Sequence, residues 1–311
     1  MKLNWESALL VLLVLEILLF GAINPRMLDI NMLLFSTSDF ICIGIVALPL
    51  TLVIISGGID ISLGSTIGLC AIALGVMMQA GWPVGVGHSA DAAARPAVRA
   101  GECGADPLHR HQSTGDYPRH ALSLRWRGLA GFPDSFTAFA NLTVVGLPLP
   151  LVLFAVITVF FWLITHRGRF GRHLFLIGQN PRAARYAALS VNGMPYALYG
   201  LVGVASAIAA LVMVSYFGSA RSDLGRDLLM PALTAAVLGG ANIYGGSGSV
   251  VGTALAALLV GYLQQGLQMV GIPSQVSSAL SGALLVVVVM GRSLSLHREW
   301  VRSLFRKLSG A

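Results

Sequence analysis

Three histidines of this 311-residue chain, His109, His111 and His120, are close enough in sequence to suggest a metal site. The His-Arg-His spacing, however, would put two of these ligands on opposite faces of a strand, and it matches no usual helical site. The sequence also contains neither H-E-x-x-H nor G-x-S-x-G, and it has no nucleophile with an evident partner base. We therefore expect no catalytic residues, no metal and no cofactor.

Any use of ATP would need another chain. A P-loop requires a lysine at the end of a glycine-rich run, and the only two lysines, Lys2 and Lys307, do not follow such a run. We therefore expect that the chain is not an enzyme and that ATP hydrolysis takes place on a separate partner subunit.

The composition is typical of a membrane protein. Apolar residues make up 56% of the chain, charged residues only 11%, and the mean hydropathy is +0.78. The net charge of +7 does not indicate nucleic-acid binding, because the arginines gather at the edges of apolar segments, where they set membrane orientation. We predict an all-α, polytopic membrane helix bundle that forms a single transmembrane domain over residues 1–311 and contacts lipid but no nucleic acid.

Eight apolar segments are predicted to span a bilayer, which about twenty mainly apolar residues cross. Four precede a central basic loop and four follow it, so the loop and both chain ends should share one compartment. Basic loops stay in the cytoplasm, and the C-terminal tail is basic too, so we place both termini there. The expected spans are Trp5–Ile23, Phe40–Ser56, Leu63–Trp82, Val144–Ile164, Tyr196–Phe217, Leu228–Tyr244, Ser249–Val270 and Val276–Met290.

The central basic loop covers residues 165–194 and carries five arginines and two histidines without a carboxylate. Within it, Asn180 can cap the free amides of a following helical turn, Pro181 suits the first helical position, and Gly193 is the expected stop. A helix of about nine residues is marginal in water on its own, so this helix should dock on something.

Small residues of this helix, among them Ala183 and Ala184, permit a close approach to a partner. Arg182 and Arg185 are three apart and share a face. The residues alone leave two partners open, another protein or anionic lipid headgroups.

Carboxylates and amides fall within or between the apolar segments. Glu16, in the first expected span, is either a buried group between helices or part of a proton relay, and we favour the structural role. Asp60, in the motif GGIDISLGS, either lines a water-filled path or caps the next helix. The amides either line a solute path or bond between helices. The candidates for a translocation path are Asp60, Asn242, Gln264 and Gln268.

Glycines mark two further features. Gly64, Gly68 and Gly75 form a small-residue face that predicts close helix packing. The segment at 216–227 balances arginines against aspartates and is expected as a non-cytoplasmic loop. The run LGGANIYGGSGSVVG at 238–252 follows no strand and lacks the dinucleotide spacing, so it predicts a tight turn and a helix contact.

The segment at 87–127 breaks the pattern. It holds six arginines, four acidic residues and four of the seven histidines, and its prolines interrupt any long helix. Such a segment does not span a bilayer, and its ordinary interpretation is a disordered extracytoplasmic loop. We also consider a pair of compensating frameshifts, because GC-rich coding DNA read out of frame yields this mixture of Ala, Arg, His, Pro and Gly. Resequencing the DNA and translating its other frames tests that hypothesis.

Three motifs in this order, GGIDISLGS, GRFGRHLFLIGQNPRAARYAAL and VLGGANIYGGSGSVVGTALAALLVGYLQQGL, resemble permeases of the ribose-type branch of bacterial ABC importers. The resemblance covers roughly residues 1–86 and 128–300. It implies a multi-pass inner-membrane permease that brings a pentose or a five-carbon signalling diol into the cytoplasm by alternating access. Such permeases usually have about ten spans, and the shortfall here falls at 87–127.

The resemblance also implies partners: a sister permease in a heterodimer, two ATP-binding subunits and a periplasmic solute-binding protein. In this family the loop that carries the second motif engages the ATPase, so residues 165–194 become a cytoplasmic coupling loop. Two other functions stay open: an ion-coupled secondary carrier and a defective, non-functional permease allele. The residues that the resemblance assigns to coupling are Gly178, Asn180, Pro181, Arg182, Ala183, Ala184 and Arg185.

Overall fold

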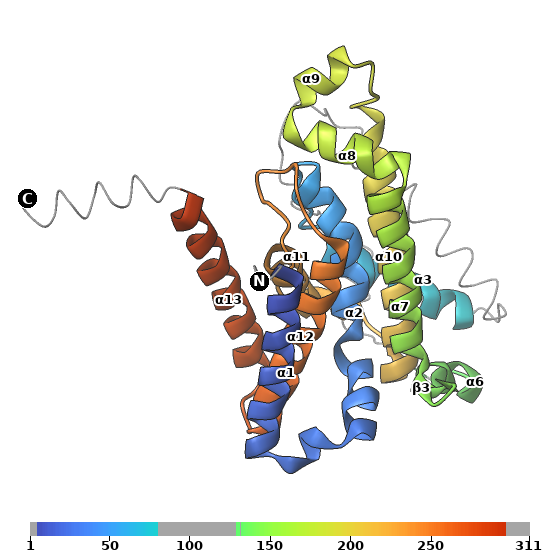
Figure 1. Ribbon diagram of the computed structural model, residues 1–311. Coiled ribbons are helices and arrows are strands. Elements are labelled where there is room, and N and C mark those ends of the chain that lie inside the picture. Colours follow the sequence, from blue (N-terminus) through green and yellow to red (C-terminus); the bar gives the residue numbers. More distant parts are fainter. Residues whose placement is uncertain (1–4, 80–128, 131, 297–311) are drawn as a thin grey trace, which may run out of the picture.

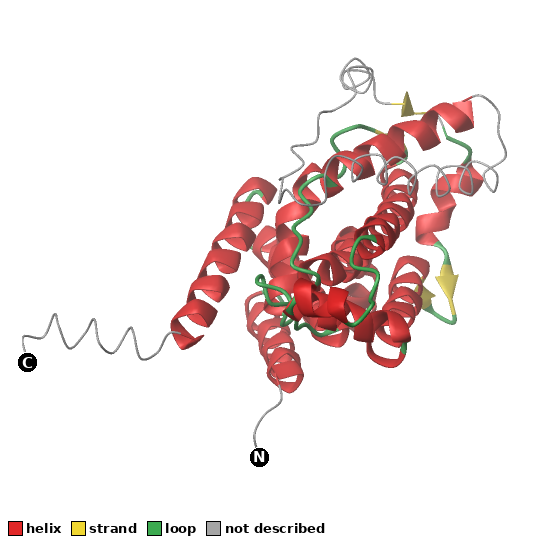
Figure 2. Ribbon diagram, turned by 90° about the horizontal axis from the view of Figure 1, so that it is seen from above, coloured by secondary structure: helices red, strands yellow, loops and turns green. Residues whose placement is uncertain are grey.

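The computed structural model describes residues 5–79, 129–130 and 132–296, and most of these residues are helical (Figure 1). The strands in these ranges form two short antiparallel pairs, β1 with β4 and β2 with β3, at the edge of the bundle (Figure 2). The expected all-α bundle is therefore confirmed for the described part of the chain. The elements in order are α1 (Trp5–Ile23), η1 (Pro25–Leu28), α2 (Ile30–Ile55), α3 (Leu63–Gln79), β1 (Leu129–Ala130), α6 (Asp134–Thr137), η2 (Ala138–Asn141), β2 (Thr143–Val144), β3 (Leu147–Pro148), α7 (Leu149–Trp162), η3 (Leu163–Arg167), α8 (Arg169–Gln179), α9 (Pro181–Tyr186), α10 (Gly193–Phe217), β4 (Ser219–Ala220), η4 (Arg226–Leu228), α11 (Leu229–Leu238), α12 (Val250–Met269) and α13 (Ser274–Leu296).

Helix α2 is the centre of the bundle. Every residue from Phe40 to Ile55 is buried, as expected of a helix that is apolar on all sides. Helices α7, α10, α11 and α12 pack around it, whereas α1 packs on α12, and α13 packs on α11 and α12 (Figure 1). Much of α1 is exposed apolar surface, which suits contact with lipid.

Glycines permit the closest helix contacts of the bundle. Phe40 of α2 lies over Gly261 of α12, where an added Cβ would be 1.9 Å from the ring. Phe154 of α7 lies over Gly44 of α2 in the same way, and Phe20 of α1 lies over Gly266 of α12. Dispersion and burial of these rings stabilise the interfaces. They also fix which helices are neighbours.

The helices alternate between two ends of the bundle. The loop end carries α8 and α9 (Figure 1). Helices α2 and α7 run toward it, and α10 and α12 run away from it. The start of α1 also lies at this end, because the Glu6 carboxylate accepts a hydrogen bond from Ser249, just before α12. Helix α13 returns toward the same end after α12, as expected for a chain with an even number of crossings.

Within the described residues, five helices are long and apolar enough to cross a membrane: α1, α2, α7 with η3, α10 and α12. Helix α3 and the apolar part of α13 are shorter, and α11 has only 10 residues. The expectation of a polytopic bundle is confirmed, but the count of eight spans is not. Helix α2 also begins ten residues earlier than the span expected from Phe40, because Asp29 caps it by accepting from the amide of Asn31.

The segment before α11, expected as a non-cytoplasmic loop at 216–227, exposes its arginines and aspartates but buries the residues between them. Ala220, Ser222 and Leu224 are buried, and their chain runs along the glycine face of α3. A Cβ on Gly68 would lie 2.0 Å from the carbonyl oxygen of Ser222. The predicted close packing at Gly64, Gly68 and Gly75 is therefore present, but its partners are the strand Ser219–Ala220 and the turns that follow it, rather than a helix.

The atypical segment at 87–127 lies outside the described residues, as do His109, His111 and His120 and the basic tail beyond 296. Among residues 5–79, 129–130 and 132–296, the structure holds no group of three His, Cys, Asp or Glu side chains that could bind a metal ion. The residues that flank the gap do meet, since Leu129 lies against Gly75 of α3. The chain thus re-enters the described part on the side where it left.

Candidate functional site: the coupling loop and its glycine junction

The loop end is built by a sharp turn between η3 and α8. Gly168 caps α8 with extended backbone, and a Cβ on Gly171 would lie only 1.8 Å from the carbonyl oxygen of Thr165. The two glycines of GRFGR therefore let α8 fold back across the end of α7. Helix α8 is amphipathic and buries Gly171, Leu174 and Ile177, which leaves its basic residues on the outer face.

Helix α9 confirms part of the predicted capping. The Asn180 side chain accepts from the amides of Arg182 and Ala183, both at 3.1 Å, and Pro181 occupies the first helical position. The predicted stop at Gly193 is wrong, because α9 ends at Tyr186 and Gly193 begins α10. The chain leaves α9 through Ala188, whose φ of 57° is left-handed; the following residues therefore turn away.

The outer face of α9 is available to a partner. Arg182, Ala183 and Arg185 are exposed, and Tyr186 is 93% exposed. Ala184 instead points inward and is 4% exposed, so it packs α9 onto the bundle and is not part of the outer surface. A surface of two arginines, an alanine and a tyrosine suits contact with a partner protein that has acidic residues around its binding surface.

The end of α8, the turn after α2 and the turn before α12 meet at a contact that we call the glycine junction. It is formed by Gly57, Gly178, Gly245 and Gly246. The amide of Gly246 donates to the carbonyl of Ile55, the last residue of α2, at 2.8 Å. A Cβ on Gly178 would lie 1.9 Å from the same carbonyl oxygen. Gly245 and Gly246 have φ of 87° and 78°, where other residues are strained. Backbone thus packs directly on backbone.

The glycine junction unites the three motifs that carry the family resemblance. Gly57 belongs to the first motif, Gly178 to the second, and Gly245 and Gly246 to the third. The expectation of a tight turn in the third motif is met. Although these residues lie far apart in sequence, they bring α8, the end of α2 and the turn before α12 into direct contact.

Two further contacts fasten the loop end. The indole nitrogen of Trp5 donates to the carbonyl of Leu238 at 2.8 Å, which holds α1 to the end of α11. The amide of Val250 donates to Nε2 of His166 at 3.5 Å, which links the start of α12 to η3. A displacement of η3 or α8 would therefore reach α2 and α12 directly.

The translocation-path candidates are not brought together by the structure. Asp60 is 1% exposed and accepts from the amide and hydroxyl of Ser62, at 3.0 and 2.9 Å, which fits the alternative of a helix cap. Asn242 lies in the glycine-rich turn at the loop end, where its side chain accepts from the amide of Tyr244. Both therefore serve local backbone structure.

The two glutamines of α12 differ. Gln264 donates to the hydroxyl of Ser281 at 3.0 Å and so bonds α12 to α13, which is the interhelical alternative. Gln268 is exposed and lines a pocket at the end opposite α8 and α9. Glu16 lies on the packing face of α1, where both carboxylate oxygens are buried and have no hydrogen-bond partner among the described residues.

Sequence reasoning missed one intramembrane carboxylate. Asp39 lies in the third turn of α2, and its carboxylate accepts a hydrogen bond from the Tyr216 hydroxyl of α10. The expected span began at Phe40 and therefore left Asp39 outside. The N-cap at Asp29, followed by a continuous helical run, was the available signal.

Comparison with known proteins agrees with this architecture. Residues 122–289 match the family described as the branched-chain amino acid transport system permease component. A protein of Enterobacter sp. strain 638, named autoinducer 2 import system permease protein LsrD, is 79% identical over 326 positions, which cover 99% of this chain and 98% of the relative. A protein of the same name from Klebsiella pneumoniae is 77% identical, over 99% of this chain and 97% of the relative. Another, from Photorhabdus temperata, is 60% identical, over 96% of this chain and 94% of the relative. No solved structure matches the chain.

The helix bundle and these matches define a membrane permease, the component of a transport system that forms the path through the membrane. The chain belongs to the branched-chain amino acid transport system permease family. The resemblance to ribose-type ABC importer permeases, drawn from the three motifs, is confirmed. The last third of the sequence, from SYFGSARSDLG to QVSSALSGALL, also resembles the D-subunit permease of the autoinducer 2 import system, and the relatives of that name confirm this resemblance.

Proposed function

We propose that this chain is the permease subunit of an ATP-driven importer that carries autoinducer 2, or a related small sugar-like solute, into the cytoplasm. The relatives of 60–79% identity carry the autoinducer 2 import name, which supports the solute. The glycine junction supports the proposed mechanism, because it connects α8, beside the exposed docking surface, with α2 and α12. ATP hydrolysis takes place on separate subunits.

The docking surface is the outer face of α9, formed by Arg182, Ala183, Arg185 and Tyr186. Asn180 and Pro181 fix the direction of this helix, and Gly178 seats α8 on the carbonyl of Ile55. ATP binding by the partner moves α8 and α9, and the glycine junction passes that movement to α2 and α12. The bundle then alternates between states that open to opposite sides.

The orientation follows from charge. The loop end carries the arginines of residues 165–194 without a carboxylate, so it faces the cytoplasm. The start of α1 and the last turn of α13 lie toward this loop end of the bundle. Both chain termini are therefore cytoplasmic. The far end, with α6 and the two strand pairs, faces the periplasm, where a solute-binding protein delivers its load.

The complete importer needs further chains. A sister permease forms the other half of the path, two ATP-binding subunits dock on the coupling loops, and the exposed apolar faces of α1 and α7 contact lipid. Eight helical segments of this chain cross or enter the membrane, and the described parts of α3 and α11 are the shortest of them.

The test is reconstitution of the chain with its sister permease and ATPase in lipid vesicles, supplied with the loaded binding protein. ATP-dependent uptake of autoinducer 2 is the expected result. Uptake that follows an ion gradient without ATP would instead identify a secondary carrier. Absence of uptake by a complex that assembles and binds ATP would identify a defective allele, and the DNA that encodes residues 87–127 would then be resequenced.

A further inference from the structure

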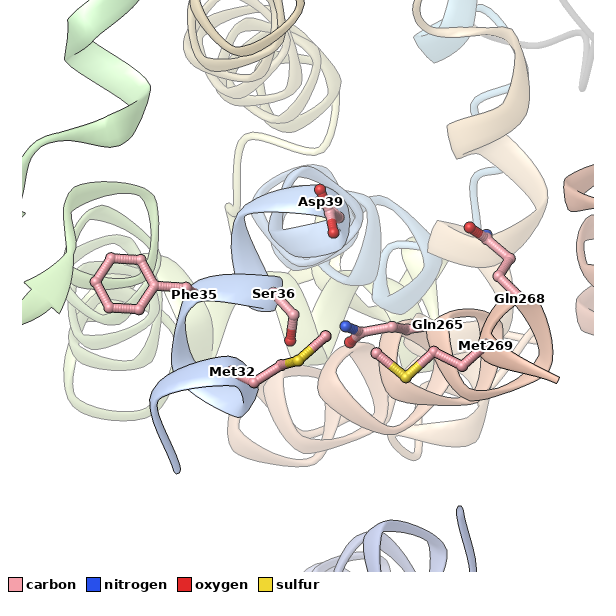
Figure 3. A pocket seen from close by; sticks show the side chains of 7 residues that line it. All are labelled: Met32, Phe35, Ser36, Asp39, Gln265, Gln268 and Met269. Atoms are coloured by element: carbon pink, nitrogen blue, oxygen red, sulfur yellow. The ribbon is translucent and has the colours of Figure 1, made fainter. Parts of the chain in front are cut away.

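A pocket of about 490 Å³ lies between the first half of α2 and the last turns of α12 (Figure 3). It is an open hollow rather than an enclosed cavity, with room for a small solute. It opens at the end of the bundle opposite α8 and α9. The side chains that face it include Met32, Ser36 and Asp39 of α2 and Gln265, Gln268 and Met269 of α12.

The polar groups of this pocket do not suit contact with hydrocarbon. Asp39 is about 14 Å along α2 from Ile30, at the usual rise per residue, and it is the one acidic or basic residue of this helix. A carboxylate at such depth is costly unless it faces a water-filled cavity or a partner. Oε1 of Gln265 is also buried and has no hydrogen-bond partner among the described residues. The Gln265 oxygen can therefore accept a hydrogen bond from water or from a solute, and the Asp39 carboxylate, which has Tyr216 as one donor, can accept further ones.

The chemistry of the lining selects a class of ligand. The Asp39 carboxylate accepts hydrogen bonds from hydroxyl groups, and the amides of Gln265 and Gln268 both donate and accept. Met32 and Met269 offer polarisable apolar surface to a carbon skeleton. The lining contains a carboxylate and no cationic side chain, so an anionic solute would be repelled.

The two helices that line the pocket are the two that reach the glycine junction. Asp39 and the carbonyl of Ile55 lie on one helix, about 24 Å apart along its axis. On α12, Gln268 lies at the pocket, and Val250 bonds to His166 at the loop end. A relative shift of α2 and α12 at the junction would therefore change the width of the pocket.

We propose that this pocket is the solute-binding station on the periplasmic half of the path, and that it takes a neutral, hydroxyl-bearing solute through Asp39, Gln265 and Gln268. The inference rests on the proposed function for its orientation and direction of transport. Tyr216 holds the carboxylate of Asp39 toward α10 by donating to it. It leaves the other acceptor positions of that carboxylate for the solute.

The first test uses the reconstituted importer with Asp39→Asn and Gln268→Leu. Each variant is expected to lower autoinducer 2 uptake roughly tenfold or more, since hydrogen bonds to charged or buried groups are lost. Binding-protein-stimulated ATP hydrolysis should stay close to the unmodified level. Asp134→Asn is the matched control, because Asp134 is an exposed carboxylate of α6 outside the pocket, and its uptake should not change. Unchanged uptake in both pocket variants would overturn the inference.

A second test does not depend on transport. Ser36→Cys places a thiol at the pocket, in a chain with Cys103→Ser; Cys42 and Cys70 are buried. A cationic thiol reagent should react faster than an anionic reagent of the same size, and Asp39→Asn should remove that preference. Autoinducer 2 should slow the labelling of Ser36→Cys and leave Asp134→Cys unaffected.

The two tests separate the inference from the proposed function. If the unmodified importer takes up autoinducer 2 but the solute does not protect Ser36→Cys, the pocket is not the binding station. If the unmodified importer does not take up autoinducer 2, the proposed function fails. The charge preference of Ser36→Cys then still shows whether the pocket is an aqueous, acidic site.

Discussion

The amide of Gly246 donates to the carbonyl of Ile55 at 2.8 Å, although the two residues are nearly two hundred positions apart. This bond joins the end of the most buried helix to the glycine-rich turn before α12. Gly178 of the coupling loop packs on the same carbonyl. Gly178, one of the residues expected to take part in coupling, thus reaches the end of α2 through a direct contact with its backbone.

Gly178→Ala should damage coupling. The added Cβ would lie 1.9 Å from the carbonyl oxygen of Ile55 and 2.7 Å from the amide nitrogen of Gly246, and backbone cannot yield as a flexible side chain can. We expect a loss of about 1–3 kcal/mol of stability and a fall in ATP-driven uptake. Thermal unfolding and uptake measure the two effects. Gly282→Ala, where the added Cβ meets nothing within 4 Å, is the control, and equal behaviour of the two variants would refute the prediction.

Asn180→Ala should weaken α9 by about 1 kcal/mol, because two amides lose their cap. Partial uncoupling is expected: ATP hydrolysis by the complex responds less to the loaded binding protein. Asn180→Ser should restore most of the response, since serine also caps helices. Failure of serine to restore it would show that the amide has a role besides capping.

Arg182→Glu together with Arg185→Glu reverses the charge of the docking surface. Both side chains are exposed, so the fold and membrane insertion should be retained while the ATPase no longer co-purifies with the permease. Replacing Ala184, an inward-facing residue, would disturb the fold instead and is not a suitable probe. Arg221→Glu, at the end of the bundle away from α9, serves as a charge control for co-purification. Normal co-purification of the double variant would rule out this docking surface.

Gly68→Ala tests the packing of α3 against the segment before α11. The new methyl group would lie 2.0 Å from the carbonyl oxygen of Ser222, so the segment before α11 must move. We expect destabilisation of about 1–3 kcal/mol, measured by thermal unfolding in detergent. An unchanged unfolding temperature would mean that α3 and this segment are not packed together.

Glu16→Leu should be tolerated. Both carboxylate oxygens are buried without a partner among the described residues, and a buried unpaired polar group costs about 1–3 kcal/mol. A higher unfolding temperature with normal uptake is expected. Loss of uptake would instead support the proton-relay alternative for this residue.

The sequence was sufficient for the class of fold, because long apolar runs have few solutions in a bilayer. It also located the cap of α9, since Asn180 followed by Pro181 is a local signal that depends on neighbouring amides alone. Boundaries were less reliable. Gly193 was taken as a helix stop and is a helix start, and Asp39 was left outside α2.

Long-range contacts could not be read from the chain. The glycines at 64, 68 and 75 predicted close packing, but a glycine face does not reveal whether a helix or an extended strand will lie on it. The glycine junction was equally hidden, because each motif has its own local interpretation as a turn. Only the folded chain shows that Gly57, Gly178 and Gly246 come together around the carbonyl of Ile55.

The glycine junction consists of peptide groups, and peptide groups neither gain protons nor form disulfides in the range of conditions a cell meets. A mechanical link of this kind has the same stiffness in acid and in neutral surroundings, and an oxidant finds no sulfur in it. Any environmental control of this permease must therefore act outside the glycine junction, at the His166 contact with α12, on the docking surface or on the far pocket.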